Sequence, residues 1–284
     1  MGLLVFFCFS ISFSGIASHS GAFLRIGVGA RALGMGGAFV ALADDATAIY
    51  WNPAGLTYLE SGEFTSMYTD QFGLGTRFSF VAYAQPLGGN KGLAIGVMHL
   101  SLGQIPITDL DENGRPIVVE YTESSDTSLL LAYAQTLFKA SLGLTIKGIH
   151  QVLAGESSWG FGIDLGSKIP LFGSFSLGAA VRTGFANWST GERATFPSQM
   201  ILGVAYLSPN LIIVFDTSFQ SDRGIEIHSG GEYWPIPQMA LRMGLDRGKP
   251  TMGTGFVIGG FKLDYALLFH ELGLCHRFSF GMEF

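Results

Sequence analysis

The chain contains the stretch Met239-Ala240-Leu241-Arg242-Met243-Gly244-Leu245-Asp246, in which large apolar residues alternate with small or charged ones. A period of two predicts a β-strand with one apolar face. The same pattern recurs from residue 61 to the end of the chain, and short clusters of turn residues separate the segments. The charges of these segments fall on the polar faces, opposite the apolar ones.

The composition excludes several classes of protein. Of the 284 residues, 48% are hydrophobic and only 13% are charged, whereas about a quarter of the residues of a soluble domain are charged. The 16 Lys and Arg residues are too few for a nucleic-acid surface, and the 40 glycines argue against a helical core. A helical membrane protein needs runs of about 20 apolar residues, which only the start of the chain supplies. A membrane protein made of strands remains, without nucleic acid as a partner.

The face on which each strand carries its apolar residues distinguishes between two all-β architectures. A soluble sandwich points its apolar faces inward and carries its charges outside, whereas an outer-membrane barrel turns its apolar faces to the lipid. Because a sandwich would need far more surface Lys and Glu, we expect an all-β fold, a transmembrane antiparallel β-barrel in contact with bacterial outer-membrane lipid. Fourteen strands are expected, near residues 61–70, 75–86, 91–103, 125–136, 140–153, 158–169, 174–186, 198–207, 210–220, 224–234, 238–246, 251–260, 261–270 and 274–284.

The connections between these strands alternate in length. The two longest, 104–124 and 187–197, are expected as loops at the outer face, and the short ones as periplasmic turns. The last strand alternates Phe278, Phe280 and Phe284 with polar or small residues. A closing strand that ends in Phe resembles the signal that such barrels present to their assembly machinery, although an ordinary amphipathic strand could end in Phe by chance.

Residues 1–20 form an apolar, uncharged stretch that ends in small polar residues, which predicts a secretory signal peptide. Its removal takes Cys8 away and leaves Cys275 as the one cysteine of the mature chain, so no disulfide is expected within the chain.

Residues 21–60 do not alternate and are rich in glycine, and a short helix is expected over 38–50, before Asn52-Pro53. Side chains alone fill a barrel of about eight strands, and fourteen strands leave a wider lumen. We therefore expect residues 21–60 to plug the lumen of a barrel formed by residues 61–284.

Three stretches of this segment, Gly27 to Ala41, Asp44-Asp45-Ala46 and Tyr50 to Leu56, closely resemble the amino-terminal region of the PorV/PorQ-like family, which belongs with the FadL-type outer-membrane channels. The resemblance implies a fourteen-stranded barrel with an amino-terminal hatch, in which Asn52-Pro53-Ala54 is the hatch motif. FadL-type members move long-chain fatty acids and other hydrophobic molecules. PorV-type members serve as outer-membrane parts of the type IX secretion system.

Two groups of residues are the candidates for function. The hatch residues expected to take part in gating are Gly34, Gly36, Gly37, Asp44, Asp45, Asn52, Pro53, Ala54 and Gly55. Asn52-Pro53 alternatively does no more than stop a helix. The charged residues expected to face the lumen are Lys147, Asp164, Lys168, Arg182, Asp216, Arg242, Asp246, Asp264, Arg277 and Glu283. They either line a polar conduit or pair with one another and with the hatch.

One further motif has the spacing of a calcium loop, with ligands at Asp109, Asp111, Asn113 and Glu120. The alternative is an acidic Asn-Gly turn in a surface hairpin. Apart from this weak calcium site no cofactor is expected, and no arrangement of catalytic residues is apparent, so the chain is not expected to be an enzyme.

The sequence thus favours a passive channel for a hydrophobic small molecule such as a long-chain fatty acid, gated by the hatch. The alternative is a non-enzymatic outer-membrane partner of a secretion-system protein. A channel predicts an apolar path through the wall, whereas a secretion partner predicts a sealed lumen and an exposed protein-binding surface.

Overall fold

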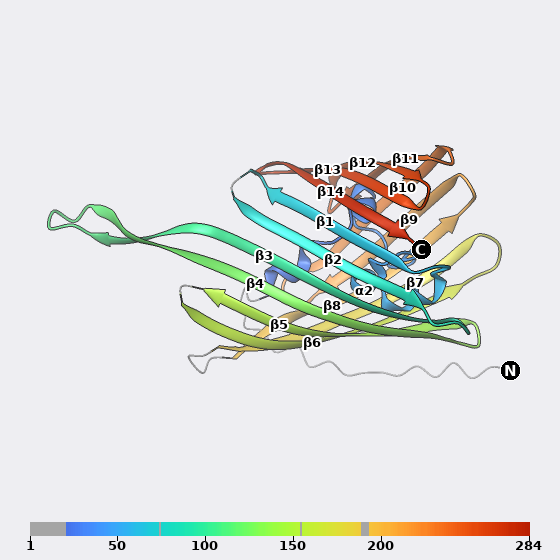
Figure 1. Cartoon of the computed structure of the whole chain (residues 1–284), viewed down its shortest axis with the longest axis horizontal. Coiled ribbons are helices and arrows are strands. Elements are labelled where there is room, and N and C mark those ends of the chain that lie inside the picture. The colour runs from blue at the N-terminus through green and yellow to red at the C-terminus, as the bar shows by residue number, and fades with distance from the viewer. Residues whose placement is uncertain (1–20, 74, 154, 189–192) are drawn as a thin grey trace.

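The computed structural model describes residues 21–73, 75–153, 155–188 and 193–284, so the predicted signal peptide lies outside the described residues. Fourteen antiparallel strands form a closed barrel, in which each strand pairs with its sequence neighbours and β1 pairs with β14 (Figure 1). The strands are β1 (Glu63–Gln71), β2 (Thr76–Pro86), β3 (Lys91–Leu110), β4 (Pro116–Leu137), β5 (Ala140–Leu153), β6 (Glu156–Pro170), β7 (Phe175–Trp188), β8 (Arg193–Leu207), β9 (Leu211–Gln220), β10 (Gly224–Ile236), β11 (Met239–Asp246), β12 (Lys249–Ile258), β13 (Phe261–His270) and β14 (Gly273–Glu283). The predicted fold class and strand number are confirmed.

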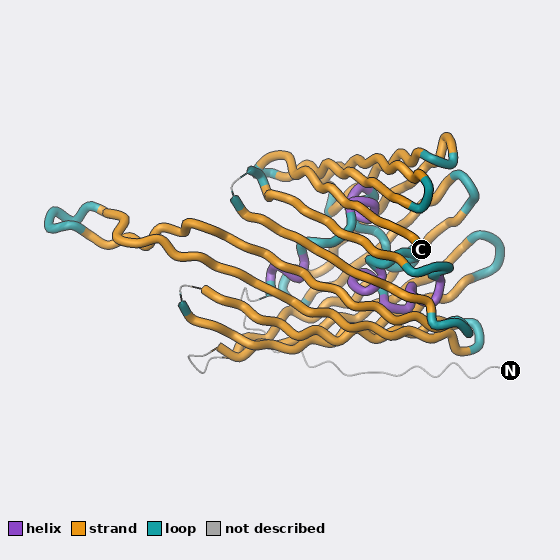
Figure 2. The backbone as a smooth tube through the Cα atoms, viewed as in Figure 1, coloured by secondary structure: helices purple, strands orange, loops and turns teal. Residues whose placement is uncertain are grey.

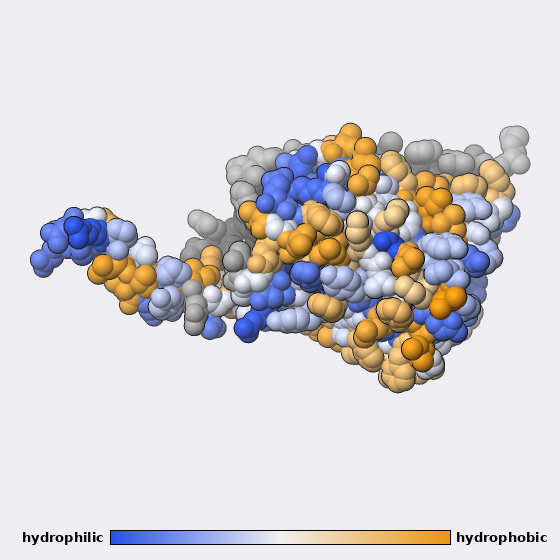
Figure 3. Space-filling model, turned by 90° about the horizontal axis from the view of Figure 1, so that it is seen from above, coloured by the Kyte–Doolittle hydropathy of each residue, from blue (hydrophilic) through white to orange (hydrophobic). Residues whose placement is uncertain are grey.

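Residues that alternate in the sequence lie alternately on the inner and the outer face of the barrel wall. On β11, Leu241, Met243 and Leu245 are 44%, 71% and 48% exposed on the outer wall, whereas Arg242 between them is 5% exposed. Figure 3 shows apolar side chains spread over the outside of the barrel. A wall of this kind is stable against lipid hydrocarbon. In the described part of the chain, no helix has both the length and the apolar character needed to cross a bilayer.

Strands β3 and β4 continue far beyond the rest of the barrel as a two-stranded hairpin (Figures 1 and 2). The expected loop 104–124 was therefore wrong, because the connection is only 111–115 and Ile107 pairs with Glu120. The β-branched residues of this stretch, among them Ile117, Val118 and Val119, favour an extended strand. The loop expected at 187–197 is likewise shortened, since β7 extends to residue 188 and β8 begins at residue 193.

Residues 21–62, here called the luminal segment, lie inside the barrel (Figure 2). Their helices are short: η1 (Ala22–Arg25), α1 (Ala30–Gly34), α2 (Ala48–Trp51) and η2 (Pro53–Tyr58). The helix expected over 38–50 was wrong for all but its last residues. The amides of Phe39 and Val40 donate to the Asp216 carboxylate of β9 at 2.8 and 2.9 Å, and the Asp45 carboxylate accepts from the Thr47 amide. A helix would pair the carbonyls of Leu42 and Ala43 with amides four residues further on, but these carbonyls accept from Lys168 Nζ of β6. The barrel wall and a local turn thus satisfy backbone groups that a helix would otherwise pair.

The luminal segment packs directly on glycines of the barrel wall, with its backbone at five of them and with the Asn52 and Pro53 side chains at Gly166. A Cβ atom added at any of these glycines would lie within 2.4 Å of an atom of the segment. These wall glycines are Gly92, Gly143, Gly166, Gly178, Gly230 and Gly244. Since real Cβ atoms do not approach other atoms so closely, the segment can reach the wall only where side chains are missing. This contact accounts for part of the high glycine content of the strands.

Replacing a wall glycine should loosen this contact. A Cβ at Gly143 would lie 2.3 Å from the Ala54 amide nitrogen, whereas a Cβ at Gly148 on the same strand has open space around it. We expect Gly143→Ala to lower the free energy of unfolding by about 1–3 kcal/mol, measured by denaturant titration in detergent. Gly148→Ala is the matched control and should not destabilise. Equal effects of the two substitutions would contradict backbone packing as the cause.

Candidate functional site

Among the described residues, two large cavities inside the barrel border the luminal segment. The end from which the hairpin projects is called the hairpin end, and the opposite end, where Phe284 lies, the C-terminal end (Figure 1). A cavity of about 250 Å³ lies toward the hairpin end and is bordered there by Phe72, Arg247 and His270. A second cavity, of about 620 Å³, lies toward the C-terminal end beside Glu283. The luminal segment forms a wall of both.

The barrier between the cavities is thin at β14. Arg277 lines the hairpin-end cavity and Ser279 the other, and two residues of a strand span only about 7 Å. At this level the Ala30 amide donates to Ser279 Oγ at 2.8 Å, and Trp51 Nε1 donates to the Val28 carbonyl at 2.9 Å. Residues 27–34 and Trp51 are therefore called the septum.

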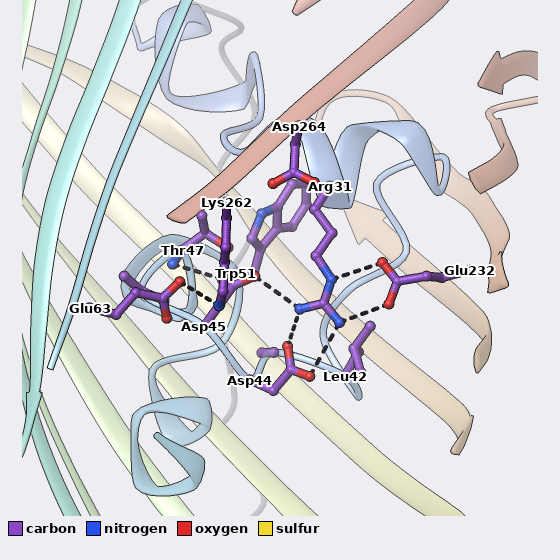
Figure 4. A network of polar contacts seen from close by, with 12 residues as sticks. Arg31, Leu42, Asp44, Asp45, Thr47, Trp51, Glu63, Glu232, Lys262 and Asp264 are labelled. Carbon is purple, nitrogen blue, oxygen red and sulfur yellow. Dashed lines mark hydrogen bonds and ion pairs between the residues drawn. The ribbon is translucent and has the colours of Figure 1, made fainter. Parts of the chain in front are cut away.

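A network of ion pairs holds the septum to the wall (Figure 4). Arg31 of α1 donates to both carboxylate oxygens of Glu232 on β10, at 3.0 Å each, and to Asp44 at 2.6 Å and Asp45 at 3.2 Å. Glu232 is completely buried and also accepts from Arg242 Nε at 2.6 Å. A bidentate pair of this kind fixes direction as well as distance. The network thus sets the position of α1 relative to β10 and β11.

The opposite charges in this network stabilise one another. Burial alone would lower the pKa of Arg31, but the carboxylates of Asp44, Glu232 and Asp45 outweigh it and hold that pKa well above its usual value. A second branch joins Lys262 Nζ to Glu63 at 3.1 Å, and Glu63 also accepts from the Ala46 amide at 3.0 Å. The luminal segment is therefore tied to β1, β10 and β13 by buried polar groups.

The predicted hatch residues fall into two places. Asp44 and Asp45 bind Arg31, and Gly34 of the septum packs on Gly253 of β12, where a Cβ would lie 3.2 Å from the Gly253 Cα. Gly36 and Gly37 follow α1 with φ of 71° and 74°, a conformation that favours glycine.

The Asn52-Pro53-Ala54-Gly55 stretch lies instead against the wall at β5 and β6. The buried Asn52 amide donates to the carbonyls of Val40 and Ser167 at 2.8 and 2.9 Å, and its oxygen accepts from the Ala54 amide at 3.2 Å. Within the described chain, none of these four residues borders either of the two cavities. In this conformation Asn52, which directly follows Trp51 of the septum, anchors the segment to the wall.

The predicted luminal charges mostly contact one another or the backbone of the luminal segment. Lys147 pairs with Asp164 at 2.6 Å, and Arg182 donates to the carbonyls of Tyr50 and Trp51 at 2.8 and 2.9 Å. The remaining partners are the Leu42 and Ala43 carbonyls for Lys168, the Phe39 and Val40 amides for Asp216, His228 and Arg247 for Asp246, Arg242 for Asp264, and Lys262 for Glu283. Arg277 is the exception, because its buried Nε and Nη1 atoms have no hydrogen-bond partner among the described residues.

Glu232 and Ser279 were missed in the sequence analysis, and Arg31 was noted only as part of a motif. A signal for Glu232 was present, because it shares the inward face of its strand with Gly230 and lies opposite Arg242 across the β10–β11 pair. Nothing in the alternation marks Ser279 as a partner of the segment, since many inward positions carry Ser.

The residues of the predicted calcium loop lie at the tip of the hairpin. The Asp111 carboxylate accepts from the amides of Asn113 and Arg115 at 2.9 and 2.8 Å, and Glu120 lies on β4 opposite Ile107. In the part of the chain that the structure describes, no three His, Cys, Asp or Glu side chains are grouped as metal ligands. Calcium binding stays a prediction.

The closing-strand phenylalanines Phe278, Phe280 and Phe284 are exposed on the outer wall. Their role as an assembly signal also stays a prediction.

No family model and no curated protein matches the chain. Among solved structures, the chain is similar to the Ralstonia pickettii toluene transporter TbuX, with 16% identity, a TM-score of 0.67 and coverage of 91% of this chain and 98% of TbuX. The Pseudomonas putida toluene transporter TodX is 14% identical, with a TM-score of 0.62 and coverage of 90% of this chain and 96% of TodX. A Pseudomonas aeruginosa FadL homologue is 11% identical, with a TM-score of 0.60 and coverage of 88% of this chain and 96% of the homologue.

These likenesses show that the chain has the fold of FadL-type outer-membrane channels. Two of these neighbours are described as toluene transporters. The finer resemblance to the PorV/PorQ-like family stays a prediction.

The buried ion pairs of Glu232 lead to a prediction about the stability of the protein. Glu232→Gln leaves Arg31 and Arg242 without the carboxylate that they share, and removing one partner of a buried ion pair costs about 3–5 kcal/mol. We expect a loss of that size in denaturant titrations. Glu271→Gln removes a carboxylate whose side chain is 82% exposed and pairs only with Lys249, and it should leave stability unchanged. A stable Glu232→Gln variant would show that the network is not what holds the septum.

Proposed function

We propose that this protein is a passive outer-membrane channel for small hydrophobic molecules, and that the luminal segment is its hatch. The arrangement of two cavities, one toward each end of the barrel and separated by a thin septum, carries the proposal. A sealed structural barrel has no need of a cavity on each side of a narrow barrier. The fold shared with structures described as toluene transporters supports the same class of cargo.

We infer the orientation from the long hairpin of β3 and β4. Because the strand number is even, Glu63 at the start of the barrel and Phe284 at its end lie at the same end. The connections at both ends are two to five residues long, but β3 and β4 extend far beyond the barrel at the other end (Figure 1). Since the longer excursions of such barrels face outward and their short turns face the periplasm, the hairpin end would lie outside the cell, and a molecule would enter the hairpin-end cavity first.

The septum is apolar where it faces the hairpin-end cavity. Leu33 and Trp51 come from the luminal segment, and Leu268 and Phe269 come from β13. Such a lining favours a ligand that gains free energy on leaving water, at about 25 cal/mol for each Å² of buried apolar surface. Passage then requires α1 to move away from β14. Glycines with positive φ flank α1, Gly27 and Gly29 before it and Gly36 and Gly37 after it, and such residues allow the chain to change direction on both sides.

A reversible cross-link across the septum tests the hatch. Because the Ala30 amide nitrogen is 2.8 Å from Ser279 Oγ, the two Cα atoms are within the range of about 7 Å that a disulfide requires. In a Cys275→Ser background, we expect the oxidised Ala30→Cys/Ser279→Cys variant to lower toluene uptake at least tenfold and the reductant to restore it. Uptake of labelled toluene is measured in cells that carry the protein in their outer membrane and lack other hydrocarbon channels.

The matched control is a disulfide within the wall, between Met243→Cys and Met252→Cys, which lie opposite each other on β11 and β12. It should leave uptake unchanged. Uptake that persists through the septum disulfide would refute the hatch and leave the channel intact, whereas cells with the wild-type protein that take up no more toluene than cells without it would refute the channel.

One observation favours the alternative, a non-enzymatic partner in protein secretion. The hairpin of β3 and β4 exposes apolar side chains beyond the barrel, at Ile107, Leu110, Ile117, Val118 and Tyr121. Exposed apolar patches of this kind often bind proteins. If secretion is the function, replacing residues 106–121 by Asn-Gly should remove a protein that copurifies with the barrel and leave toluene uptake as it was. Absence of any stoichiometric protein partner from the wild-type barrel would set this alternative aside.

A further inference from the structure

The projecting hairpin of β3 and β4 is a two-stranded ribbon with two open edges. Strand β2 ends its pairing with β3 at Leu102, and β5 ends at Leu153, opposite Ser124 of β4. Beyond these residues, β3 and β4 pair only with each other within the described chain (Figure 1). In an antiparallel pair, alternate residues turn their N–H and C=O groups away from the partner strand. Both edges of the ribbon therefore present unpaired backbone groups.

Residues 117–123 of β4, here called the β4 edge, are the better template for a further strand. They contain no proline, whereas Pro106 interrupts the edge of β3 because it has no N–H group to donate. Val119 forms a β-bulge, which increases the local twist but does not end the strand, since pairing with β3 continues on both sides of it. A strand added to the β4 edge would lie in line with β5, beyond Leu153. It would thus continue the sheet of the barrel wall.

The side chains of the β4 edge favour a further strand. Ile117, Val119 and Tyr121 are 46%, 56% and 62% exposed, and β-branched and aromatic side chains of this kind gain stability from cross-strand neighbours. A two-stranded hairpin is only marginally stable in water by itself. Natural proteins often protect open edges with Lys, but residues 103–123 contain no Lys. A third strand would cover these side chains and stabilise the ribbon.

The charge of the ribbon selects the kind of partner. Residues 103–123 carry five carboxylates and one cation, Arg115 at the tip. Glu120 and Glu123 of the β4 edge are exposed, and neither has an ion-pair partner within the described chain. A second copy of the same ribbon would place like charges side by side, which destabilises strand pairing. The acidic edge therefore favours a partner strand that carries positive charge.

We propose that the β4 edge binds an extended, cationic segment of another polypeptide as a third strand of the ribbon. Backbone hydrogen bonds to β4 hold the segment, as in other cases of strand addition to an open sheet edge. Its β-branched side chains pack on Ile117, Val119 and Tyr121, and its Lys or Arg side chains lie beside Glu120 and Glu123. This interaction surface goes beyond the proposed channel and does not depend on it.

The test uses three labelled heptapeptides, whose binding to the full-length barrel in detergent is measured by fluorescence anisotropy at low salt. The first probe is Lys-Val-Thr-Val-Lys-Val-Thr, and the second has Glu in place of both Lys residues. We expect the first to bind about 10-fold more tightly than the second, because its charges are opposite to those of Glu120 and Glu123. The third probe, Lys-Pro-Thr-Pro-Lys-Pro-Thr, keeps the charge of the first but has fewer N–H groups to donate, and it should not bind.

The double variant Glu120→Lys/Glu123→Lys should reverse the preference, so that the Glu peptide binds more tightly than the Lys peptide. Both positions are exposed and lie beyond the barrel, so the variant should fold. Glu271→Lys is the matched control, because it reverses an exposed carboxylate at the hairpin end, in the turn between β13 and β14. It should leave the preference for the Lys peptide unchanged.

Hydrogen exchange locates the bound peptide on the ribbon. The Lys peptide should slow amide exchange in residues 117–123 of the wild-type protein, because a third strand pairs their free N–H groups. Exchange in residues 103–110, which form the opposite edge, should change less.

Several results would overturn the proposal. Equal binding of the Lys and Pro peptides would show attraction between charges without strand pairing, and equal binding of the Lys and Glu peptides would show that the acidic residues select nothing. Protection of residues 103–110 alone would place the strand on the wrong edge. A peptide-free barrel that dimerises through residues 117–123 would make a second copy the occupant. If none of the peptides binds while toluene uptake persists, this inference fails and the proposed channel stands.

Discussion

The structure depends on one constraint: a fourteen-stranded lumen is too wide for its own side chains, so a chain segment must fill it without leaving buried backbone groups unpaired. The luminal segment is largely irregular and cannot satisfy those groups itself. The wall does so with side chains of several strands, among them Lys168 on β6, Arg182 on β7 and Asp216 on β9, which bind backbone carbonyls or amides of the segment. Wall glycines let the two backbones approach closely enough for this pairing. The charged residues and the glycines on the inner face of the wall therefore act together: the glycines let the luminal segment come close, and the charged side chains bind its backbone.

This constraint explains why most of the lumen charge is structural. A polar conduit needs charges that face free water, whereas the cations and anions described here mostly hold one another or the segment. Their distribution is also uneven. The ion pairs of Arg31, Glu232 and Arg242 lie on the side of α1 that faces the C-terminal-end cavity, while the face toward the hairpin end presents Leu33 and Trp51. A hydrophobic molecule coming from the hairpin end would meet the apolar side of the septum and leave past the polar one.

Sequence reasoning predicted the barrel well, because alternation over whole strands such as β11 is a repeated signal that one misread residue does not change. It failed where a prediction depended on one short stretch of sequence or on the resemblance to a family. The hairpin beyond residue 103 lacks the regular in-and-out pattern, since both of its faces meet solvent, and its sequence therefore predicts a loop. The helix expected over 38–50 had suitable local propensity, but Lys168, from a strand far along the chain, binds the Leu42 and Ala43 carbonyls that a helix would pair. Neither the pairing of Asp216 with a backbone amide nor the place of Asn52 at the wall is encoded in local spacing.

The same reasoning separates Arg277 from its neighbours. Arg182 and Lys168 lie where the segment turns its carbonyls to the wall, and they bind those carbonyls. At β14 the septum offers the Ala30 amide, a donor, which binds Ser279. Among the described residues, Arg277 Nε and Nη1 have no hydrogen-bond partner. At β14 the septum therefore contacts the wall through a donor of its own backbone, whereas at β6 and β7 it does so through its carbonyls.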